Sequence, residues 1–235
     1  MTPMAKLHVV ATPIGNLEDI TLRALRILKE VDVILCEDTR VTKKLLSKYE
    51  IKTPTLSYHS HSKLSKLEKI FELLKEGKDL AMVSDAGTPT ISDPGAQLVS
   101  KVREKFGDTS AGGVEVLVVP GASALTSALS VAGLPASEFL FLGFLPHKKG
   151  RKTLFAEMAE SKRTVVFYES PHRLLKTLES LSKNLTIHRK VSVSRELSKL
   201  YEDTISGSVI DVLDHFKSRP DTVKGEFVIV VSGSK

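Results

Sequence analysis

The fold is decided by residues 80–95, LAMVSDAGTPTISDPG, where an apolar run leads into a loop rich in glycine and proline. The run at 80–83 has the length and composition of a buried strand. The loop ends at Asp93 and Pro94, which suit the cap and the first turn of a following helix. Loops at the carboxyl ends of strands are where open α/β sheets bind ligands. We therefore expect an α/β fold with a ligand site at this loop.

The residues of this loop suit ligand binding. Gly87 lets the backbone approach a ligand closely, and the prolines restrict the free loop before it binds. Asp85 offers a carboxylate acceptor for an ammonium or hydroxyl group. A tight loop that serves only turn geometry has the same composition. Two similar loops, TPIGNL at 12–17 and PGASA at 120–124, also follow apolar runs and weaken that simpler interpretation.

Strand and helix patterns alternate through residues 1–119. A helix with Leu67, Ile70 and Leu74 on one face is the clearest, and it spans residues 62–76. Strands that alternate with helices form parallel sheets covered on both faces. We therefore predict an N-terminal α/β domain with a mostly parallel sheet. Its strands are expected at residues 7–11, 31–36, 55–58, 80–83 and 114–119.

Residues 120–235 are predicted to form a second α/β domain. The connections near residues 190–206 are too short for crossover helices, so we expect a mixed sheet there. Three helices are predicted in this domain. The first ends near Arg163, the second has Leu174, Leu178 and Leu181 on one face, and the third covers residues 209–216. The predicted strands lie at residues 139–144, 164–168, 190–194, 201–206 and 227–231.

The net charge, the apolar runs and the cysteine count of the chain indicate which partners and which cellular compartment to expect. The chain has 235 residues and a net charge of +6, which favours an anionic partner, although solubility explains this charge equally well. No apolar run reaches about 18 residues, so we expect no membrane span. The amino terminus lacks the apolar segment of a signal peptide, which predicts a cytoplasmic protein. The lone cysteine, Cys36, excludes an intramolecular disulfide and suits a buried position.

Several common site motifs are missing from the sequence. It contains neither the glycine-rich phosphate loop that ends in Gly-Lys-Ser/Thr nor the Gly-x-Gly-x-x-Gly fingerprint of dinucleotide-binding folds. It also lacks the Gly-x-Ser-x-Gly turn of α/β-hydrolases. The seven histidines show no metal-binding helix pair, and we expect no metal site.

An ordered set of short motifs resembles the tetrapyrrole methylase superfamily and, within it, the ribosomal RNA small subunit methyltransferase I branch. Each motif alone is a weak signal, but the set is specific because it keeps its order along most of the chain. The motifs are VATPIGNLEDIT at 10–21, EDTR at 37–40, SDAGTP at 84–89, DPG at 93–95, PGASA at 120–124, GLP at 133–135, GFLP at 143–146, YESPHR at 168–173, REL at 195–197 and GE at 225–226.

The resemblance implies two α/β domains with S-adenosyl-L-methionine bound in the cleft between them. It implies methyl transfer to the ribose 2′-hydroxyl of a cytidine in 16S ribosomal RNA, within the small ribosomal subunit. It also implies a homodimer. The family's cofactor site carries over to Pro13, Asp85, Gly87, Thr88, Ser123, Ala124, Tyr168, Leu197 and Gly225.

Transfer from a sulfonium mainly requires that the oxygen, the methyl carbon and the sulfur be aligned. A general base helps, because a ribose hydroxyl is a weak acid. Glu37, Asp38 and Glu169 lie at strand exits and are the candidates for that base. Ion pairing with Arg40 or Arg173, or helix capping, explains the same carboxylates. Tyr168 is either a base or a stacking surface.

Basic residues near the strand exits are candidates for RNA phosphate contacts, which would make affinity depend on salt. An ordinary solvated charge explains any one of them equally well. With no tryptophan and 6% aromatic residues, the sequence predicts no obvious base-stacking platform. The candidates are Arg40, Lys43, Lys44, Lys148, Lys149, Arg151, His172, Arg173 and Arg195.

Two other functions remain open. One is a small-molecule methylase of the same superfamily, which acts on a tetrapyrrole or a modified protein side chain. The basic turn at 147–152 and the cluster at 37–40 argue against it. The other is an RNA-binding protein without catalysis. Binding of S-adenosylmethionine separates this second function from both methylases, and the identity of the methyl acceptor separates the methylases from each other.

Overall fold

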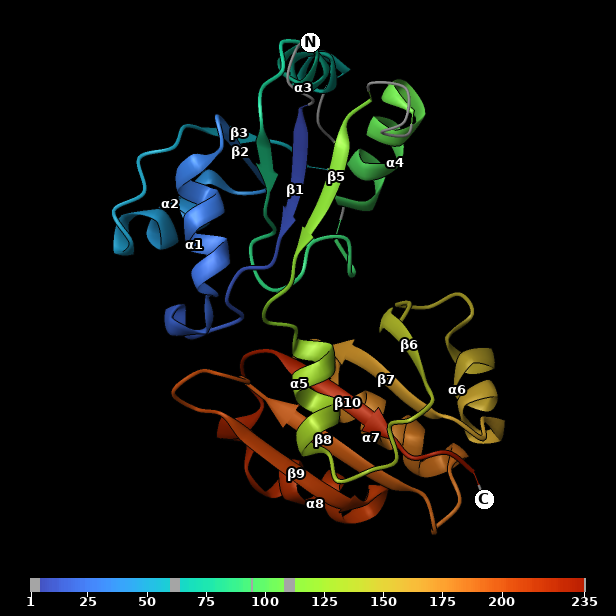
Figure 1. Cartoon of the computed structure of the whole chain (residues 1–235). Helices are drawn as coiled ribbons and strands as arrows, with labels where there is room; N and C mark the ends of the chain where they lie inside the picture. The colour runs from blue at the N-terminus through green and yellow to red at the C-terminus, as the bar shows by residue number, and fades with distance from the viewer. Residues whose placement is uncertain (1–4, 60–63, 94, 108–112, 235) are drawn as a thin grey trace. The chain divides into compact units, whose positions relative to one another are not determined.

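The computed structural model describes residues 5–59, 64–93, 95–107 and 113–234. The chain divides into two compact units, Met1–Ser123 and Ala124–Lys235, which Figure 1 colours from blue to green and from green to red. The predicted boundary lay after residue 119. It falls after residue 123 because the intervening loop packs on the first unit. A Cβ on Gly121 would lie 3.0 Å from the Cβ of Ala11.

The first unit is built on a parallel sheet with the strand order β3-β2-β4-β1-β5. Every strand pair in this sheet is parallel, as the alternation of strands and helices predicts. The strands are β1 (Lys6–Val10), β2 (Val33–Cys36), β3 (Thr55–Ser57), β4 (Leu80–Met82) and β5 (Glu115–Val119).

Helices cover both faces of this sheet, and two apolar clusters form its core. Leu28 of α1 and Leu45 of α2 pack with Ile34 on one face, whereas Ile70 of α3 and Leu98 of α4 pack on the other. Figure 1 shows the two helix pairs on opposite sides of the strands. Cys36 is 1% exposed, as predicted for a small buried hydrophobe. The elements are η1 (Leu17–Asp19), α1 (Leu22–Glu30), α2 (Thr39–Lys48), α3 (Leu64–Lys75) and α4 (Gly95–Phe106).

The second unit contains a mixed sheet with the strand order β6-β7-β10-β8-β9. Only β6 and β7 pair in parallel, and the other neighbouring strands are antiparallel. This arrangement confirms the mixed sheet that the short connections predicted. The strands are β6 (Phe139–Phe144), β7 (Thr164–Glu169), β8 (Lys190–Arg195), β9 (Asp203–Ser208) and β10 (Phe227–Val231).

One large apolar cluster lies between this sheet and three helices. Phe155 of α6, Leu178 of α7 and Phe216 of α8 pack against alternate residues of the strands. The helix α5 lies on β10 and β7, as Figure 1 shows. The bounds are α5 (Ala124–Val131), α6 (Arg151–Glu160), α7 (Leu174–Asn184), α8 (Val209–Ser218) and η3 (Pro220–Thr222). Among the described residues, no helix is both long and apolar enough to span a bilayer.

A few predicted bounds differ from the structure. The strand predicted at 201–206 begins at Asp203, because the amide of Glu202 closes a turn onto the carbonyl of Lys199. The helix predicted to reach Arg163 ends at Glu160, because the amide of Ser161 donates to the carbonyls of Glu157 and Met158 and closes the last turn. The predicted helix start at 62 and the proposed first-turn residue Pro94 lie outside the described residues.

Candidate functional site

The three loops singled out in the sequence meet at the carboxyl edge of the first sheet. β4, β1 and β5 are neighbours there, so their exits lie side by side. The amide of Thr12 donates to the carbonyl of Gly87 at 2.9 Å, and the amide of Gly87 donates back at 3.0 Å. This reciprocal pair is an isolated bridge that joins the loops after β1 and β4.

Two buried hydroxyl groups secure this junction. Thr12 and Ser84 are each 5% exposed. The Thr12 hydroxyl donates to the carbonyl of Ser84 at 3.1 Å, and the Ser84 hydroxyl lies 3.2 Å from the carbonyl of Gly87. Buried carbonyls need such partners, so the hydroxyls stabilise the loop conformation. Sequence reasoning missed both roles, although each residue directly follows a predicted strand.

Gly87 occupies a position that favours glycine. Its φ is +80°, and a Cβ there would lie 3.3 Å from Cγ2 of Ile14 and 3.7 Å from the carbonyl oxygen of Ala122. The hydroxyl of the next residue, Thr88, donates to the same carbonyl at 3.1 Å. The loop after β4 therefore contacts the loops after both β1 and β5.

Asp85 lies at the exposed tip of this loop and links it to the exit of β2. One carboxylate oxygen of Asp85 accepts the amide of Asp38 at 3.1 Å. The Asp38 carboxylate caps α2 and pairs with Arg40 at 2.6 Å. Hydrogen bonds from the side chain and amide of Arg40 lower the pKa of Asp38 to about 2. A carboxylate with so low a pKa is a poor general base.

Glu37 differs from Asp38 in its surroundings. Burial raises the pKa of Glu37, and the negative charges of Asp93 and Asp85 raise it further. Glu37 lines a small pocket together with Tyr58 and Asp93, at the carboxyl ends of β2 and β4. Of the two neighbouring carboxylates, Glu37 is therefore the better proton acceptor near neutral pH.

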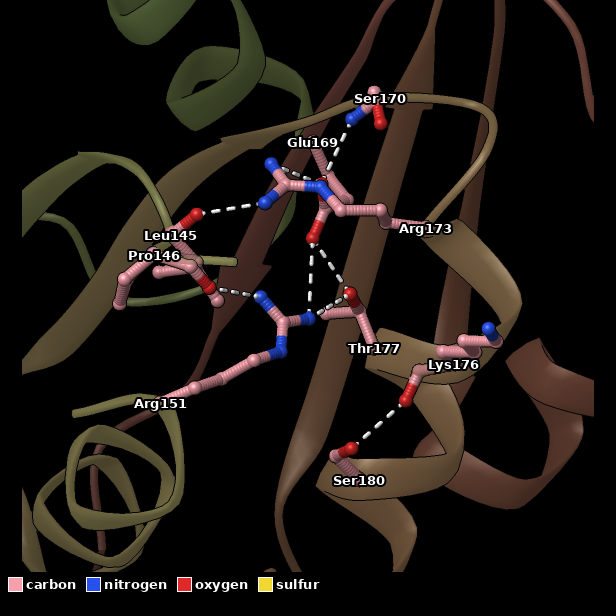
Figure 2. A network of polar contacts seen from close by, with 9 residues as sticks. All are labelled: Leu145, Pro146, Arg151, Glu169, Ser170, Arg173, Lys176, Thr177 and Ser180. Atoms are coloured by element: carbon pink, nitrogen blue, oxygen red, sulfur yellow. Dashed lines mark hydrogen bonds and ion pairs between the residues drawn. The ribbon is translucent and has the colours of Figure 1, made fainter. Parts of the chain in front are cut away.

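Glu169, the third candidate base, lies in a buried ion-pair network in the second unit (Figure 2). Its side chain is 0% exposed and pairs with Arg173 at 2.7 Å. The Thr177 hydroxyl donates to the other carboxylate oxygen at 2.6 Å, and Arg151 approaches that oxygen at 3.5 Å. Thr177 is a further participant that sequence reasoning missed. This geometry favours the ion-pairing interpretation of Glu169.

The two arginines of this network also bind backbone carbonyls. Arg173 donates to the carbonyl of Leu145 at 2.8 Å, and Arg151 donates to that of Pro146 at 3.1 Å, as Figure 2 shows. Both arginine side chains are 16% exposed. Their guanidinium groups thus fix the chain after β6, which favours a structural role over the predicted phosphate contacts.

Tyr168 connects β7 to the start of α5. Burial raises the pKa of its phenol, and the backbone of Leu125 hydrogen-bonds to it. The ring makes edge contacts with Phe141 and Phe144, with centroids 5.1 Å and 5.4 Å away. A tyrosine with a raised pKa stays neutral near pH 7, so the geometry favours packing over base catalysis.

These features can be compared with known proteins. The family model described as Tetrapyrrole (Corrin/Porphyrin) Methylases matches residues 6–212. The chain belongs to this family. A protein of Thermotoga maritima named Ribosomal RNA small subunit methyltransferase I is 47% identical to it, over 99% of this chain and 100% of the relative. A protein of the same name from Bacillus subtilis is also 47% identical, over 98% of this chain and 76% of the relative. The chain is therefore a member of that branch of the tetrapyrrole methylases.

Solved structures agree on the fold. A cobalt precorrin-4 methyltransferase matches with a TM-score of 0.69 and 18% identity, over 97% of this chain and 94% of that chain. A uroporphyrin-III-C-methyltransferase from Thermus thermophilus matches with a TM-score of 0.64 and 20% identity, with the same coverage. At such low identity these neighbours establish the tetrapyrrole methylase fold alone.

Glu196 contacts the chain next to two cofactor positions implied by the tetrapyrrole methylase resemblance, Leu197 and Gly225. The carboxylate of Glu196 accepts the amide of Glu226 and the ammonium of Lys199, both at 2.9 Å. Gly225 has a φ of +90°, and a Cβ there would collide with the Glu196 side chain. Glu196 thus links the segment that contains Leu197 to the residue that follows Gly225.

The remaining basic candidates differ in accessibility. In the second unit, Lys148, Lys149 and His172 are exposed, whereas Arg195 donates to the carbonyl of Lys224 at 2.9 Å. In the first unit, Lys43 and Lys44 are exposed on α2. Within the described residues, no group of three or more histidine, cysteine, aspartate or glutamate side chains is arranged to hold a metal.

Proposed function

We propose that this protein transfers the methyl group of S-adenosylmethionine to the 2′-hydroxyl of a cytidine ribose in 16S ribosomal RNA. Membership of the ribosomal RNA small subunit methyltransferase I branch supports the class of substrate. The observation that carries the proposal is the reciprocal hydrogen-bonded pair of Thr12 and Gly87. It joins the loops at the exits of β1 and β4, the kind of sheet edge where open α/β sheets bind ligands.

The residues at this edge fit the proposed cofactor. Asp85 presents an exposed carboxylate, which suits the ammonium and sulfonium groups of S-adenosylmethionine. Gly87, at a φ of +80°, lets the loop turn next to Ile14 and the Ala122 carbonyl, which brings the loops after β1, β4 and β5 together beside Asp85. We assign the cofactor contacts of the first unit to Pro13, Asp85, Gly87, Thr88 and Ser123. The second-unit positions Ala124, Tyr168, Leu197 and Gly225 stay predictions from the resemblance.

We assign the general base to Glu37. S-adenosylmethionine supplies a methyl group on a positively charged sulfur, which needs no further activation. The Glu37 carboxylate would accept the proton of the ribose hydroxyl as the oxygen takes the methyl group, and the sulfur would keep the electron pair of the bond that breaks. The raised pKa of Glu37 brings its basicity closer to working pH, which improves this proton transfer.

The partners and compartment follow from the same proposal. An enzyme that modifies 16S RNA in the small ribosomal subunit works in the cytoplasm. The homodimer implied by the resemblance is a prediction for sedimentation analysis. A tetrapyrrole substrate is less well supported, because the relatives named for ribosomal RNA are far more similar to this chain than the neighbours named for tetrapyrroles.

The test is transfer of labelled methyl from S-adenosylmethionine to small ribosomal subunits. We expect the wild type to label 16S RNA and Glu37→Gln to lower the rate about a hundredfold or more, the usual contribution of a general base. Cofactor affinity should stay unchanged. The matched control, Glu76→Gln, removes an exposed carboxylate at the end of α3 and should keep the wild-type rate.

Two results would contradict the proposal. If the wild type binds S-adenosylmethionine without labelling RNA, the substrate assignment is wrong and a small-molecule acceptor is favoured. If Glu37→Gln keeps the wild-type rate, Glu37 is not the base. The variant Asp38→Asn tests the contribution of Asp38 to activity independently of Glu37. An asparagine still caps α2, so this variant should lose less activity than Glu37→Gln.

A further inference from the structure

The helix α2 has a charge pattern that the proposed chemistry does not explain. It carries Arg40, Lys43, Lys44 and Lys48 and contains no carboxylate. Every other described helix with a cationic side chain also carries at least one aspartate or glutamate. A solvated helix usually mixes both signs, which gives stabilising pairs along its surface. The one-sided charge of α2 therefore points to an anionic partner.

The core contacts of α2 orient these cations. Thr42, Leu45 and Leu46 are buried against the first sheet, so the opposite face of the helix is exposed. Arg40, Lys44 and Lys48 follow one another at intervals of four residues, which places them about 6 Å apart along the helix. Successive phosphates along an RNA strand have a similar spacing. The exposed face of α2 thus matches the charge and the repeat of one RNA backbone.

The first cation of this series is held next to the proposed site. Asp38 caps α2, and its amide donates to Asp85 in the loop after β4. The Asp38 carboxylate also binds the Nε and one terminal nitrogen of Arg40 at 3.0 Å and 2.6 Å. The Arg40 side chain nevertheless remains 88% exposed. Its guanidinium is therefore oriented before binding and still accessible to a phosphate.

We propose that α2 is a track for the sugar-phosphate backbone of a single RNA strand, with Arg40 at the end nearest Glu37 and Asp85. This assignment rests on the proposed function and adds the surface that guides the substrate. Arg151 and Arg173 are not part of this surface, because their guanidinium groups bind Glu169 and backbone carbonyls.

The test compares two triple variants that each remove three positive charges. Lys43→Gln, Lys44→Gln and Lys48→Gln together remove three of the four positive charges of α2 and leave the Asp38–Arg40 pair intact. The control combines Lys75→Gln, Lys101→Gln and Lys105→Gln, whose exposed side chains lie on α3 and α4 across the sheet. The readouts are affinity for protein-free 16S RNA and for small subunits against salt concentration, and affinity for S-adenosylmethionine.

We expect the track variant to bind RNA with a shallower dependence on salt. The slope of log K against log salt should fall by about 2, because each single-strand phosphate contact contributes about 0.7. Its KM for small subunits should rise at least tenfold, while cofactor affinity stays at the wild-type value. Arg40→Gln alone should lower RNA affinity in the same direction. The slope of log K against log salt should decrease less in the control triple variant than in the track variant.

Three outcomes separate the possibilities. Equal slopes for the two triple variants, with normal methylation by the wild type, would overturn the track and leave the proposed function standing. A weaker affinity of the track variant for small subunits but not for protein-free RNA would also overturn it, in favour of a ribosomal protein as the partner. If the wild type neither binds nor methylates RNA, the proposed function itself fails.

Discussion

At the residue scale, the neighbours Glu37 and Asp38 differ although both lie at the exit of β2. Asp38 caps α2 and pairs with Arg40, which lowers its pKa to about 2. Glu37 is partly buried and faces Asp93 and Asp85, which raise its pKa. The sequence predicted both carboxylates as candidates. It did not rank them, because the rank depends on burial and on partners from distant parts of the chain.

The raised pKa of Glu37 predicts a stability effect with a definite sign. The folded state holds the Glu37 proton more tightly than the unfolded chain does, so this stabilisation is present at low pH and is lost as pH rises through the raised pKa. Glutamine mimics the protonated form. Glu37→Gln should therefore raise the Tm by a few degrees at about pH 8, and this gain in Tm should shrink toward about pH 5.

Thermal melts of both proteins across this pH range measure the effect. Glu76→Gln, which removes a carboxylate in an exposed position, should show no comparable trend. A Glu37→Gln variant that is less stable than the wild type at every pH would mean that the ionised carboxylate stabilises the fold. That result would contradict the surroundings assigned to Glu37.

At the scale of elements, the loop after β4 depends on the backbone conformation of Gly87. Alanine at φ +80° costs about 1–2 kcal/mol in strain. Gly107 is a matched control, because its φ is +67° and nothing lies within 4 Å of a Cβ placed there. We expect both Gly87→Ala and Gly107→Ala to lower the Tm, Gly87→Ala by more because its Cβ would also press on Ile14. Only Gly87→Ala should weaken S-adenosylmethionine binding, by at least tenfold.

Calorimetric titration of both variants with S-adenosylmethionine decides this point. If Gly87→Ala binds the cofactor as tightly as Gly107→Ala does, the loop after β4 is not a cofactor contact. The comparison is informative because both variants place alanine at a positive φ, so a difference in cofactor affinity reports on the loop after β4.

Some elements were predictable from local patterns and others were not. The alternation of strands and helices was sufficient for the parallel sheet, and the loops after β1, β4 and β5 were identified from glycine, proline and hydroxyl residues. The Glu169 network was not predictable in detail, because Arg151 and Thr177 reach it from separate helices. The start of β9 was missed because a turn bond at Glu202 outweighs the strand propensity of Tyr201.

At the scale of the whole molecule, the order of short motifs was more informative than any single site. The motifs indicated the tetrapyrrole methylase family, which the match over residues 6–212 confirms. The fold and family were therefore accessible from the sequence. The acceptor atom was not, because proteins with names for corrin and porphyrin substrates share this fold at 17–20% identity.

The chemical identity of the methylated product decides whether this protein is a ribose methyltransferase. 16S RNA from small subunits incubated with the protein and labelled S-adenosylmethionine is digested to nucleosides and analysed by mass spectrometry, with Asp85→Ala alongside. We predict label in 2′-O-methylcytidine, and its loss in Asp85→Ala. Label on a nucleobase, on a ribosomal protein or on no component of the subunit would contradict ribose methylation by this protein.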